Sequence, residues 1–414
     1  MNWIPKVICV AGKNDIAVEV LLYLKERYDF KLCVVCNRTE NGKNTHQKSL
    51  RWFADNNGIE ELKLEDVYKI EGLIFLSMEY DRIIKPERFY DAKLYNIHFS
   101  NLPKYKGVYT SVFPILNGEK YAGVTIHEID QGIDTGSIID QKVFPIKDFN
   151  CRDLYYEYEK IGTSLVKKNL DRLIKGDYTA TPQRATDSTY YGKKSIDYQN
   201  LSIDCNQTAE GISRQIRAFG YREYQLPEVN GHIIMDAYIT DIPSVEKSGS
   251  VLYENENGIM MSCIDYNVFL YFDRFDELMD ACSIGDIQKV RDICIAKRHA
   301  NEQDEHGWTP LIVATYNNHK DIVKYLISIG ADIRCKNNNG TNLLMYAKEA
   351  YKNQKDDGLF TLYYRLGLSL DDRDYYGKST REYMMEEGIV INIEESKKRQ
   401  KSLTIIEFKG KISP

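Results

Sequence analysis

Apolar runs alternate with segments of helical spacing through the first part of the chain. In the segment between the first two runs, apolar residues recur every three or four positions, which predicts a helix that Asp15 caps. Strands separated by helices are typical of βαβ units and predict a mainly parallel sheet. Four runs have the character of buried strands: KVICVAG (6–12), KLCVVCN (31–37), GLIFLS (72–77) and LYNIHFS (94–100).

Two further strands and a long helix close the first domain. The strands GVTIHEID (123–130) and GSIIDQKVFPI (136–146) flank the loop QGIDTG, and residues 151–176 have the spacing of an amphipathic helix. Beyond this helix the pattern changes to one short helix and alternating segments joined by Gly or Asn turns. We therefore predict a Rossmann-like α/β domain over residues 1–184 and a small β-rich accessory subdomain over residues 185–272.

The remainder of the chain repeats itself. The segment around Thr309-Pro310-Leu311 closely resembles an ankyrin repeat, whose period is about 33 residues. Each such unit buries its apolar face only against a neighbour. We predict an all-α ankyrin module over residues 273–397 and a C-terminal tail over residues 398–414. The same pair of positions recurs in three units: Leu278 with Ala281, Leu311 with Ala314, and Leu344 with Ala347.

Composition narrows the class of protein. The 414 residues carry a net charge of -6, which gives no overall electrostatic reason to bind nucleic acid. The first residues lack the tripartite pattern of a signal peptide, and no run of about 18 uncharged apolar residues follows. Nine scattered cysteines are typical of reduced thiols in a cytoplasmic protein. We expect a cytoplasmic protein that neither spans a membrane nor binds nucleic acid.

The CxxC pair of Cys33 and Cys36 does not indicate a metal site. In an extended strand the two side chains face opposite sides, and no second pair or histidine cluster follows to complete a zinc set. We therefore expect no metal.

Polar side chains gather where the strand at residues 94–100 ends. Asn96 and His98 are two residues apart, so they share one face at the end of a strand, where open α/β sheets bind ligands. Asp134 lies on a downstream turn. A carboxylate beside an imidazole orients it and favours its protonated form, while an amide can donate to an oxygen that gains negative charge. Because no Ser or Cys has an elbow-like setting, these groups suit direct transfer between two bound molecules.

The motif NIHFSNLPKYKG (96–107), followed by GVTIHEIDQGIDTGSII (123–139), resembles the 10-formyltetrahydrofolate-dependent formyltransferases. Their Asn-x-His-x-Ser-x-Leu-Pro motif and downstream Asp-Thr-Gly match in order. The resemblance implies that 10-formyltetrahydrofolate is the co-substrate and that His98 handles protons. It also implies that Asn96 stabilises the tetrahedral oxyanion and that Asp134 positions and polarises His98.

Shorter segments, among them ICVAGKNDIAVE and YKGVYTSVFPILNGE, are similar to the nucleotide-sugar N-formyltransferases, some of which carry ankyrin repeats. This implies a homodimer that formylates a dTDP-linked 3-amino-3,6-dideoxyhexose, the glucose before the galactose epimer. The product would serve bacterial surface polysaccharides such as the O-antigen of lipopolysaccharide. One alternative is another acceptor, such as a 4-amino sugar or tRNA. The other is a non-catalytic ankyrin scaffold whose formyltransferase-like domain only binds ligand.

Ligand contacts are expected on loops. The family's pterin contacts follow a strand that corresponds to residues 72–77, which implies folate binding by Ser77, Met78, Glu79, Tyr80 and Ile83. Helix N-termini, Arg forks and planar rings suit a nucleotide diphosphate, so we expect sugar-nucleotide contacts from Lys13, Asn14, Lys104, Tyr105, Tyr109, Arg217, Tyr221 and Tyr224.

For one histidine and one aromatic pair, two interpretations stay open. His127 is expected to be a structural histidine, with substrate contact as the alternative. Trp308 and Tyr316 in the ankyrin module predict a second nucleotide-sugar site or a protein anchor, against packing between repeats.

Overall fold

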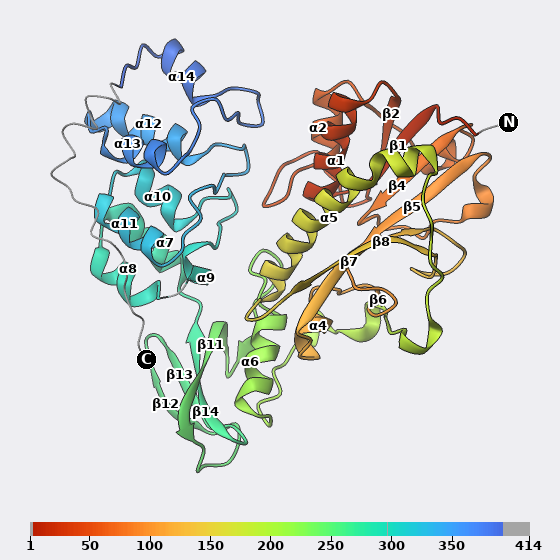
Figure 1. Ribbon diagram of the computed structural model, residues 1–414. Coiled ribbons are helices and arrows are strands. Elements are labelled where there is room, and N and C mark those ends of the chain that lie inside the picture. Colours follow the sequence, from red (N-terminus) through yellow and green to blue (C-terminus); the bar gives the residue numbers. More distant parts are fainter. Residues whose placement is uncertain (1–2, 296, 392–414) are drawn as a thin grey trace. The chain divides into compact units, whose positions relative to one another are not determined.

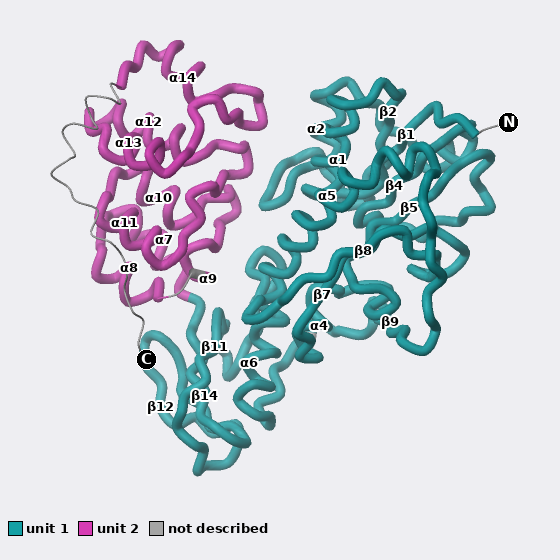
Figure 2. Tube along the Cα trace, viewed as in Figure 1, with its two compact units in different colours: residues 1–273 teal, residues 274–414 magenta. Residues whose placement is uncertain are grey.

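The computed structural model describes residues 3–295 and 297–391. The chain divides into two compact units, Met1–Asp273 and Arg274–Pro414, which Figure 2 colours separately. The predicted fold class is confirmed, because the first unit is α/β with a second, small β-sheet and the described part of the second unit is helical. Within the described residues, no helix has the length and apolar character needed to cross a membrane.

The central sheet of the first unit has seven strands in the order β3-β2-β1-β4-β5-β7-β8 (Figure 1). The five strands β3, β2, β1, β4 and β5 are parallel to one another, whereas β7 and β8 run antiparallel to their neighbours. The carboxyl end of β5 therefore lies between the parallel and the antiparallel half. The bounds are β1 (Val7–Gly12), β2 (Lys31–Cys36), β3 (Glu60–Glu61), β4 (Leu73–Met78), β5 (Ala92–His98), β7 (Tyr121–Glu128) and β8 (Ile138–Pro145).

Helices cover this sheet, and α1 and α5 lie together on one side of it (Figure 1). The long α5 begins at a capping box of Asn150 and Asp153 and ends at Gly176, whose φ is 70°. The predicted cap by Asp15 is wrong: α1 begins at Asn14, and the Asp15 carboxylate accepts the Lys48 backbone N–H at 2.8 Å. The bounds are α1 (Asn14–Arg27), α2 (Leu50–Asn56), α3 (Leu64–Val67), α4 (Phe113–Leu116) and α5 (Cys151–Lys175).

A second sheet of five antiparallel strands has the order β10-β11-β14-β13-β12. Helix α6 (Ala209–Ala218) packs on β11 and β14. Its N-terminus is capped by Thr208, whose side chain accepts the Gly211 N–H. The strands are β10 (Glu228–Val229), β11 (His232–Pro243), β12 (Val251–Asn255), β13 (Gly258–Met261) and β14 (Tyr266–Phe272). Between the two sheets in sequence, β9 (Tyr190–Tyr191) returns to pair in parallel with β6 (Lys106–Gly107).

The second unit is built from helices whose buried positions follow the repeat. Leu278, Leu311 and Leu344 are at most 1% exposed, as stacking between repeats requires. Part of the predicted ankyrin range, residues 392–397, and the whole predicted tail, residues 398–414, lie outside the described residues. The helices are α7 (Phe275–Ile284), α8 (Ile287–Ile293), α9 (Lys297–Ala300), α10 (Pro310–Tyr316), α11 (Lys320–Ser328), α12 (Leu343–Gln354), α13 (Gly358–Arg365) and α14 (Thr380–Glu386).

Gly12, at the end of β1, has no room for a side chain. Its φ is +150°, and an added Cβ would lie 1.7 Å from the Met78 carbonyl oxygen on β4. We predict that Gly12→Ala lowers the free energy of unfolding by about 3–5 kcal/mol, the sum of overpacking and an unfavourable φ. Urea denaturation measures this loss.

The matched control is Gly58→Ala. Gly58 also has a positive φ, +66°, but no atom lies within 4 Å of the added Cβ. This variant should lose only about 1 kcal/mol. Equal losses in the two variants would contradict the close approach of β1 and β4.

Candidate active site

Asn96 and His98 stand at the carboxyl end of β5 on the same face. Antiparallel pairing with β7 sets Asn96 opposite His127 and His98 opposite Thr125. Paired residues of neighbouring strands point to the same face, so two histidines and one amide meet there. The rings of His98 and His127 are 6.5 Å apart between centroids.

The Asp134 carboxylate connects these side chains. Its Oδ1 lies 3.1 Å from Asn96 Nδ2, 3.6 Å from His98 Nδ1 and 3.6 Å from His127 Nε2. Its Oδ2 accepts the Gly107 N–H at 2.9 Å. The Asp134 side chain is only 11% exposed, and those of His98 and His127 are 9% and 3% exposed. The three side chains predicted from the sequence therefore come together in a largely dehydrated site, although their catalytic roles stay predictions.

The turn that carries Asp134 is held in an unusual conformation. Asp134 has a φ of +54°, which few residues other than glycine adopt. Gly136 follows where an added Cβ would lie 1.7 Å from the Glu128 carbonyl oxygen. The Thr135 hydroxyl donates to Asp130 at 2.6 Å and braces the loop. The Asp-Thr-Gly sequence is thus explained by the close approach of this turn to the end of β7.

Electrostatics keep Asp134 ionised. Burial by itself raises the pKa of the Asp134 carboxyl, but the charge of His98, the hydrogen bond and charge of His127 and the Gly107 N–H outweigh it. The net result is a pKa well below the ordinary value for aspartate. A permanent negative charge therefore faces both imidazoles.

The outer nitrogens of the two imidazoles are bound to backbone oxygens. His98 Nε2 lies 2.8 Å from the Tyr105 carbonyl oxygen, and His127 Nδ1 lies 2.7 Å from that of Glu128. Because a carbonyl only accepts, each of these nitrogens carries a proton. His98 Nδ1 and His127 Nε2 then face the site. Asn96 Nδ2 also lies 3.1 Å from His127 Nε2.

Sequence reasoning missed part of this constellation. The contact of His127 with Asn96 and its approach to Asp134 were not predicted, while its structural role and the alternative of substrate contact both stay predictions. The signal was the strand register, which sequence periodicity alone does not fix. Gly107 and Gln183 were also missed, because they act through a backbone N–H and an amide on loops without periodicity.

The predicted folate and sugar contacts after β4 and β1 form one buried network. Glu79 Oε2 accepts from Asn14 at 3.1 Å and from the Tyr155 hydroxyl at 2.7 Å. Burial raises the pKa of the Glu79 carboxyl, which the Lys13 charge and these hydrogen bonds offset only in part. Glu79 thus points toward the loop expected to bind the sugar nucleotide. Of the other predicted folate residues, Ser77 and Met78 are buried in β4, Tyr80 is half-buried and Ile83 is 68% exposed.

Aromatic side chains gather beside this network. Tyr221 is buried and stands edge-on to Tyr224 at 4.6 Å, whereas Tyr224 is 60% exposed. The ring centroids of His46 and Tyr224 are 5.7 Å apart. Arg217, on α6, donates to the Phe149 carbonyl and pairs with Glu210. Of these predicted contacts, Tyr224 presents the most accessible ring.

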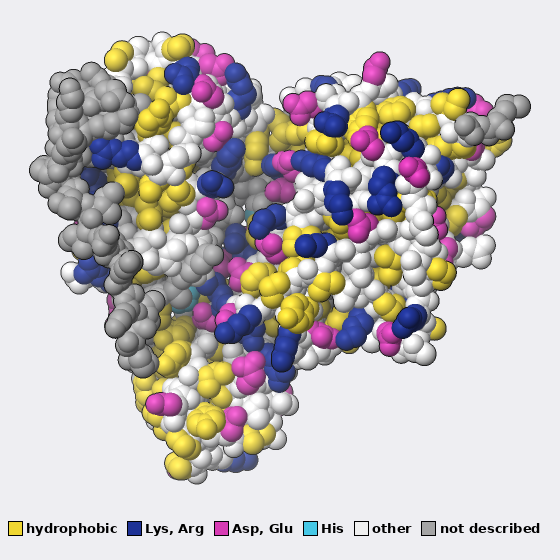
Figure 3. Space-filling view, in the orientation of Figure 1, with side chains coloured by type: hydrophobic (Ala, Val, Ile, Leu, Met, Phe, Trp, Pro, Cys, Tyr) yellow, Lys and Arg dark blue, Asp and Glu magenta, His cyan; other side chains and the backbone are white. Residues whose placement is uncertain are grey.

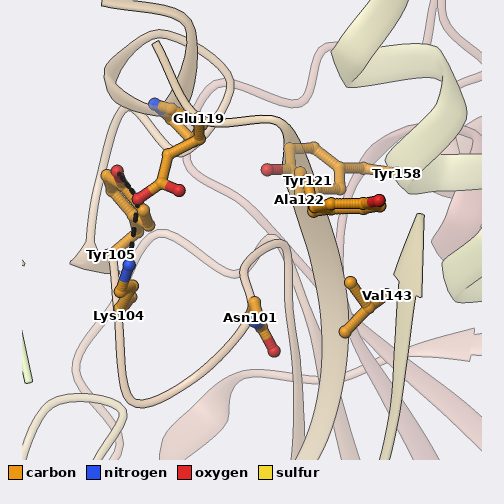
Figure 4. Close-up of a pocket in the computed structure, with 9 residues that line it drawn as sticks. Asn101, Lys104, Tyr105, Glu119, Tyr121, Ala122, Val143 and Tyr158 are labelled. Atoms are coloured by element: carbon orange, nitrogen blue, oxygen red, sulfur yellow. Dashed lines mark hydrogen bonds and ion pairs between the residues drawn. The ribbon is translucent and has the colours of Figure 1, made fainter. Parts of the chain in front are cut away.

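The Lys104 and Tyr105 side chains turn away from Asn96, His98 and Asp134, the predicted catalytic trio. Both bond to Glu119, at 3.0 Å and 2.9 Å, as Figure 4 shows. They line a cavity of about 240 Å³ that also includes Tyr121 and Tyr158 but none of the trio. Tyr109 donates to the Lys193 carbonyl at 3.1 Å. Sugar contact by these three side chains stays a prediction.

In the second unit, Trp308 packs against other rings. Its ring centroid lies 5.7 Å from that of Tyr316, which is 39% exposed, and 5.4 Å from that of Tyr346. The Tyr346 hydroxyl accepts from Asn337 at 2.8 Å. These contacts agree with packing between repeats and leave the second nucleotide-sugar site a prediction.

The described residues hold no group of three or more His, Cys, Asp or Glu side chains that could bind a metal ion. On the face drawn in Figure 3, basic side chains of the first unit are interspersed with acidic ones.

Comparison with protein-family models gives two matches. The model described as formyl transferase matches residues 8–160, and a model of three ankyrin repeats matches residues 278–362. The second match confirms the predicted ankyrin module.

Two solved structures are similar over about two thirds of the chain. The crystal structure of WlaRD, a sugar 3N-formyltransferase, in the presence of dTDP and 5-N-formyl-THF, is 41% identical with a TM-score of 0.61, covering 66% of this chain and 99% of that one. An N-formyltransferase from Helicobacter canadensis in complex with folinic acid and dTDP-3-aminofucose is 40% identical with a TM-score of 0.61, covering 65% and 100%.

Among curated proteins, the methionyl-tRNA formyltransferase of Nitrosospira multiformis is 33% identical over 172 residues, which are 41% of this chain and 54% of that protein. The corresponding protein of Lactobacillus gasseri is 29% identical over 177 residues, 42% and 54%. This chain thus spans about half the length of the first curated relatives that it matches.

The low pKa of Asp134 is testable by pH titration. Removing the His98 charge leaves burial less opposed, so His98→Asn should raise the pKa of the Asp134 carboxyl. Carboxyl ¹³C NMR should show no titration of Asp134 between pH 7 and about 4 in the wild type, since the free value is about 3.9.

The same shift affects stability. A folded-state pKa below the unfolded value means that ionised Asp134 stabilises the fold above pH about 4, and that this contribution is lost as the pH falls further. An Asp134 carboxyl that titrates at its ordinary pKa in the wild type would contradict the assigned geometry.

Proposed function

Because this chain belongs to the formyltransferase family, we propose that it transfers a formyl group from 10-formyltetrahydrofolate to the amino group of a dTDP-linked 3-amino-3,6-dideoxyhexose. The observation that carries the proposal is the Asp134 carboxylate within reach of Asn96, His98 and His127. Such a group of donors around one buried anion suits a reaction in which negative charge develops on an oxygen.

The acceptor is inferred from the two similar structures. WlaRD is a sugar 3N-formyltransferase, and the Helicobacter canadensis protein was solved with dTDP-3-aminofucose. Both are matched over almost their whole length, unlike the methionyl-tRNA formyltransferases. We infer a 3-amino sugar, with the glucose epimer placed first and the galactose epimer second. The product is proposed to enter surface polysaccharides such as O-antigen, and the reaction to take place in the cytoplasm.

The first step is attack of the neutral sugar amine on the formyl carbon. A new C–N bond forms, and the formyl oxygen becomes an oxyanion. Protonated His98 Nδ1 is the donor that faces the site, since Nε2 is engaged by the Tyr105 carbonyl. Asn96 supplies a second donor when one of its amide N–H groups turns to the oxyanion. Each such donor lowers the barrier because it is already oriented in a dehydrated site.

The second step moves one proton and breaks one bond. The attacking nitrogen loses a proton, folate nitrogen N10 gains one, and the C–N10 bond breaks to release tetrahydrofolate and the formamide. Asp134 remains ionised throughout, because His98, His127 and Gly107 stabilise its charge. Its role is to orient and polarise His98, while holding both substrates together supplies further rate enhancement.

Homodimerisation is a separate part of the proposal. The small sheet exposes apolar side chains on β11 and its edge strand β12, including Tyr238 at 58%, Val251 at 43% and Tyr253 at 49%. An exposed apolar edge strand invites pairing with another chain. Sedimentation that returns only monomer at micromolar concentration would refute the dimer.

A second nucleotide-sugar site at Trp308 and Tyr316 is retained as a proposal. It rests on the partly exposed Tyr316 ring beside Trp308. Calorimetric titration that returns one equivalent of nucleotide sugar per chain would remove it.

The acceptor is tested by a panel assay. We expect the full chain with 10-formyltetrahydrofolate to formylate dTDP-linked 3-amino-3,6-dideoxyhexoses and to leave dTDP-4-amino-4,6-dideoxy sugars and methionyl-tRNA unmodified, as followed by product mass. Reaction of a 4-amino sugar alone would overturn the acceptor but keep the chemistry. Folate binding without any reaction would favour the scaffold alternative.

Replacement of His98 tests the chemistry. We predict that His98→Asn lowers kcat by about 10²–10⁴-fold, the usual contribution of general acid–base catalysis. Binding of 5-formyltetrahydrofolate should persist. The control is His306→Asn, because the His306 side chain is 73% exposed in the second unit, and it should keep wild-type turnover. Unchanged turnover of His98→Asn would refute the catalytic assignment.

A further inference from the structure

Residues 183–191, here called the connecting segment, lie in sequence between the seven-stranded and the five-stranded sheet of the first unit. They return to the loops that carry Tyr105 and Asp134. The segment begins seven residues after Gly176, which ends α5, and it contains β9. Most of its side chains are exposed, so it contributes little to the hydrophobic core. Its contacts to the site are polar and specific.

Gln183 holds the turn that carries Asp134. Its Nε2 donates to the Asp134 carbonyl at 2.8 Å and to the Gly136 carbonyl at 2.7 Å. The two N–H groups of one amide thus bridge the backbone on either side of Thr135. Because Asp134 has a φ of +54°, this bridge stabilises a conformation that the turn would otherwise adopt rarely.

Thr189 holds the loop that carries Tyr105 and Lys106. Its hydroxyl accepts the Tyr105 N–H at 2.8 Å, and its carbonyl accepts the Lys106 N–H at 2.9 Å. Tyr105 also has a positive φ, 59°, and its carbonyl is the partner of His98 Nε2. Thr189 is therefore linked to His98 through a single residue.

The strand pair that follows continues this attachment. β9 pairs with β6 so closely that a Cβ on Gly107 would lie 2.2 Å from the Tyr191 carbonyl oxygen. The Gly107 N–H donates to the Asp134 carboxylate. One segment thus fixes the backbone partners of both His98 and Asp134.

We propose that Gln183 and Thr189 are positioning residues of the active site: Gln183 sets the Asp134 turn and Thr189 sets the Tyr105 carbonyl that orients His98. This inference rests on the proposed formyl transfer for its kinetic consequence but not for its structural one. Neither residue touches the reacting atoms. Their effect is on geometry, where a displacement of about 1 Å can cost about 10²-fold in rate.

Gln183→Glu tests the first residue. A carboxylate of the same shape cannot donate to the two carbonyls and repels both. We expect kcat to fall about 10- to 100-fold with KM for both substrates unchanged. The matched control is Gln303→Glu in the second unit, where Nε2 likewise donates to two carbonyls, Gly307 at 3.1 Å and Lys336 at 3.2 Å. This variant should keep wild-type kcat.

A pair of variants tests Thr189. Thr189→Val keeps the shape but removes the hydroxyl that accepts the Tyr105 N–H, whereas Thr189→Ser keeps it. Because Thr189 is exposed, neither change should prevent folding. We expect kcat to fall about tenfold or more in Thr189→Val and to be restored in Thr189→Ser, with KM unchanged in both. Equal activity of Thr189→Val and wild type would overturn the role of this residue.

An NMR measurement separates this proposal from the proposed function. The His98 Nε2–H, bound to the Tyr105 carbonyl, should give an exchange-protected imidazole signal that is absent in His98→Asn. Thr189→Val should lose the protection and Thr189→Ser should keep it. If the wild type formylates no acceptor, the proposed function fails while this signal still decides the positioning role. Persistent protection in Thr189→Val would overturn it whatever the activity.

Discussion

A buried carboxylate stays ionised only where neighbouring groups replace the water that it has lost. Asp134 meets this condition with donors or cations from three separate places in the sequence: His98 on β5, His127 on β7 and the Gly107 N–H of β6. The charge and the geometry therefore depend on each other. If one partner moves, the cost of burying the carboxylate is no longer offset, so the site has one favoured arrangement.

The fold supplies this arrangement at its topological boundary. The carboxyl end of β5 lies between a parallel neighbour, β4, and an antiparallel one, β7, so paired side chains of β5 and β7 reach one face. Loops then complete the site with backbone groups. Several of their residues have positive φ, among them Tyr105 and Asp134, and such strain persists only where surrounding contacts determine the conformation.

Sequence periodicity predicted the helices and strands, and it predicted that Asn96 and His98 lie on one face of a strand. Alternation along a strand sufficed to set Asn96 and His98 on one face, and the Asp-Thr-Gly turn indicated Asp134. The contribution of His127 depended on the register of β7, which no local pattern encodes.

Loop contacts were beyond the reach of the sequence for a different reason. The pairing of β6 with β9 involves two residues on each side, too few for any period to be visible. The Glu79 carboxylate accepts hydrogen bonds from Asn14 and Tyr155, which no local pattern indicates, and folate binding by Glu79 stays a prediction. Asp15 likewise accepts from Lys48 rather than capping its helix. Each of these contacts joins residues that lie far apart in the sequence, so no local pattern encodes it.

We propose that the Asp134 charge organises the chemical step and not substrate binding. Single-turnover rapid-quench measurement of formyl transfer by Asp134→Asn, with both substrates saturating, separates these two roles. We expect a chemical step slowed by about 10²–10⁴-fold, as when an amide replaces the carboxylate beside a catalytic histidine, with unchanged affinity for each substrate. A chemical step at the wild-type rate would contradict it.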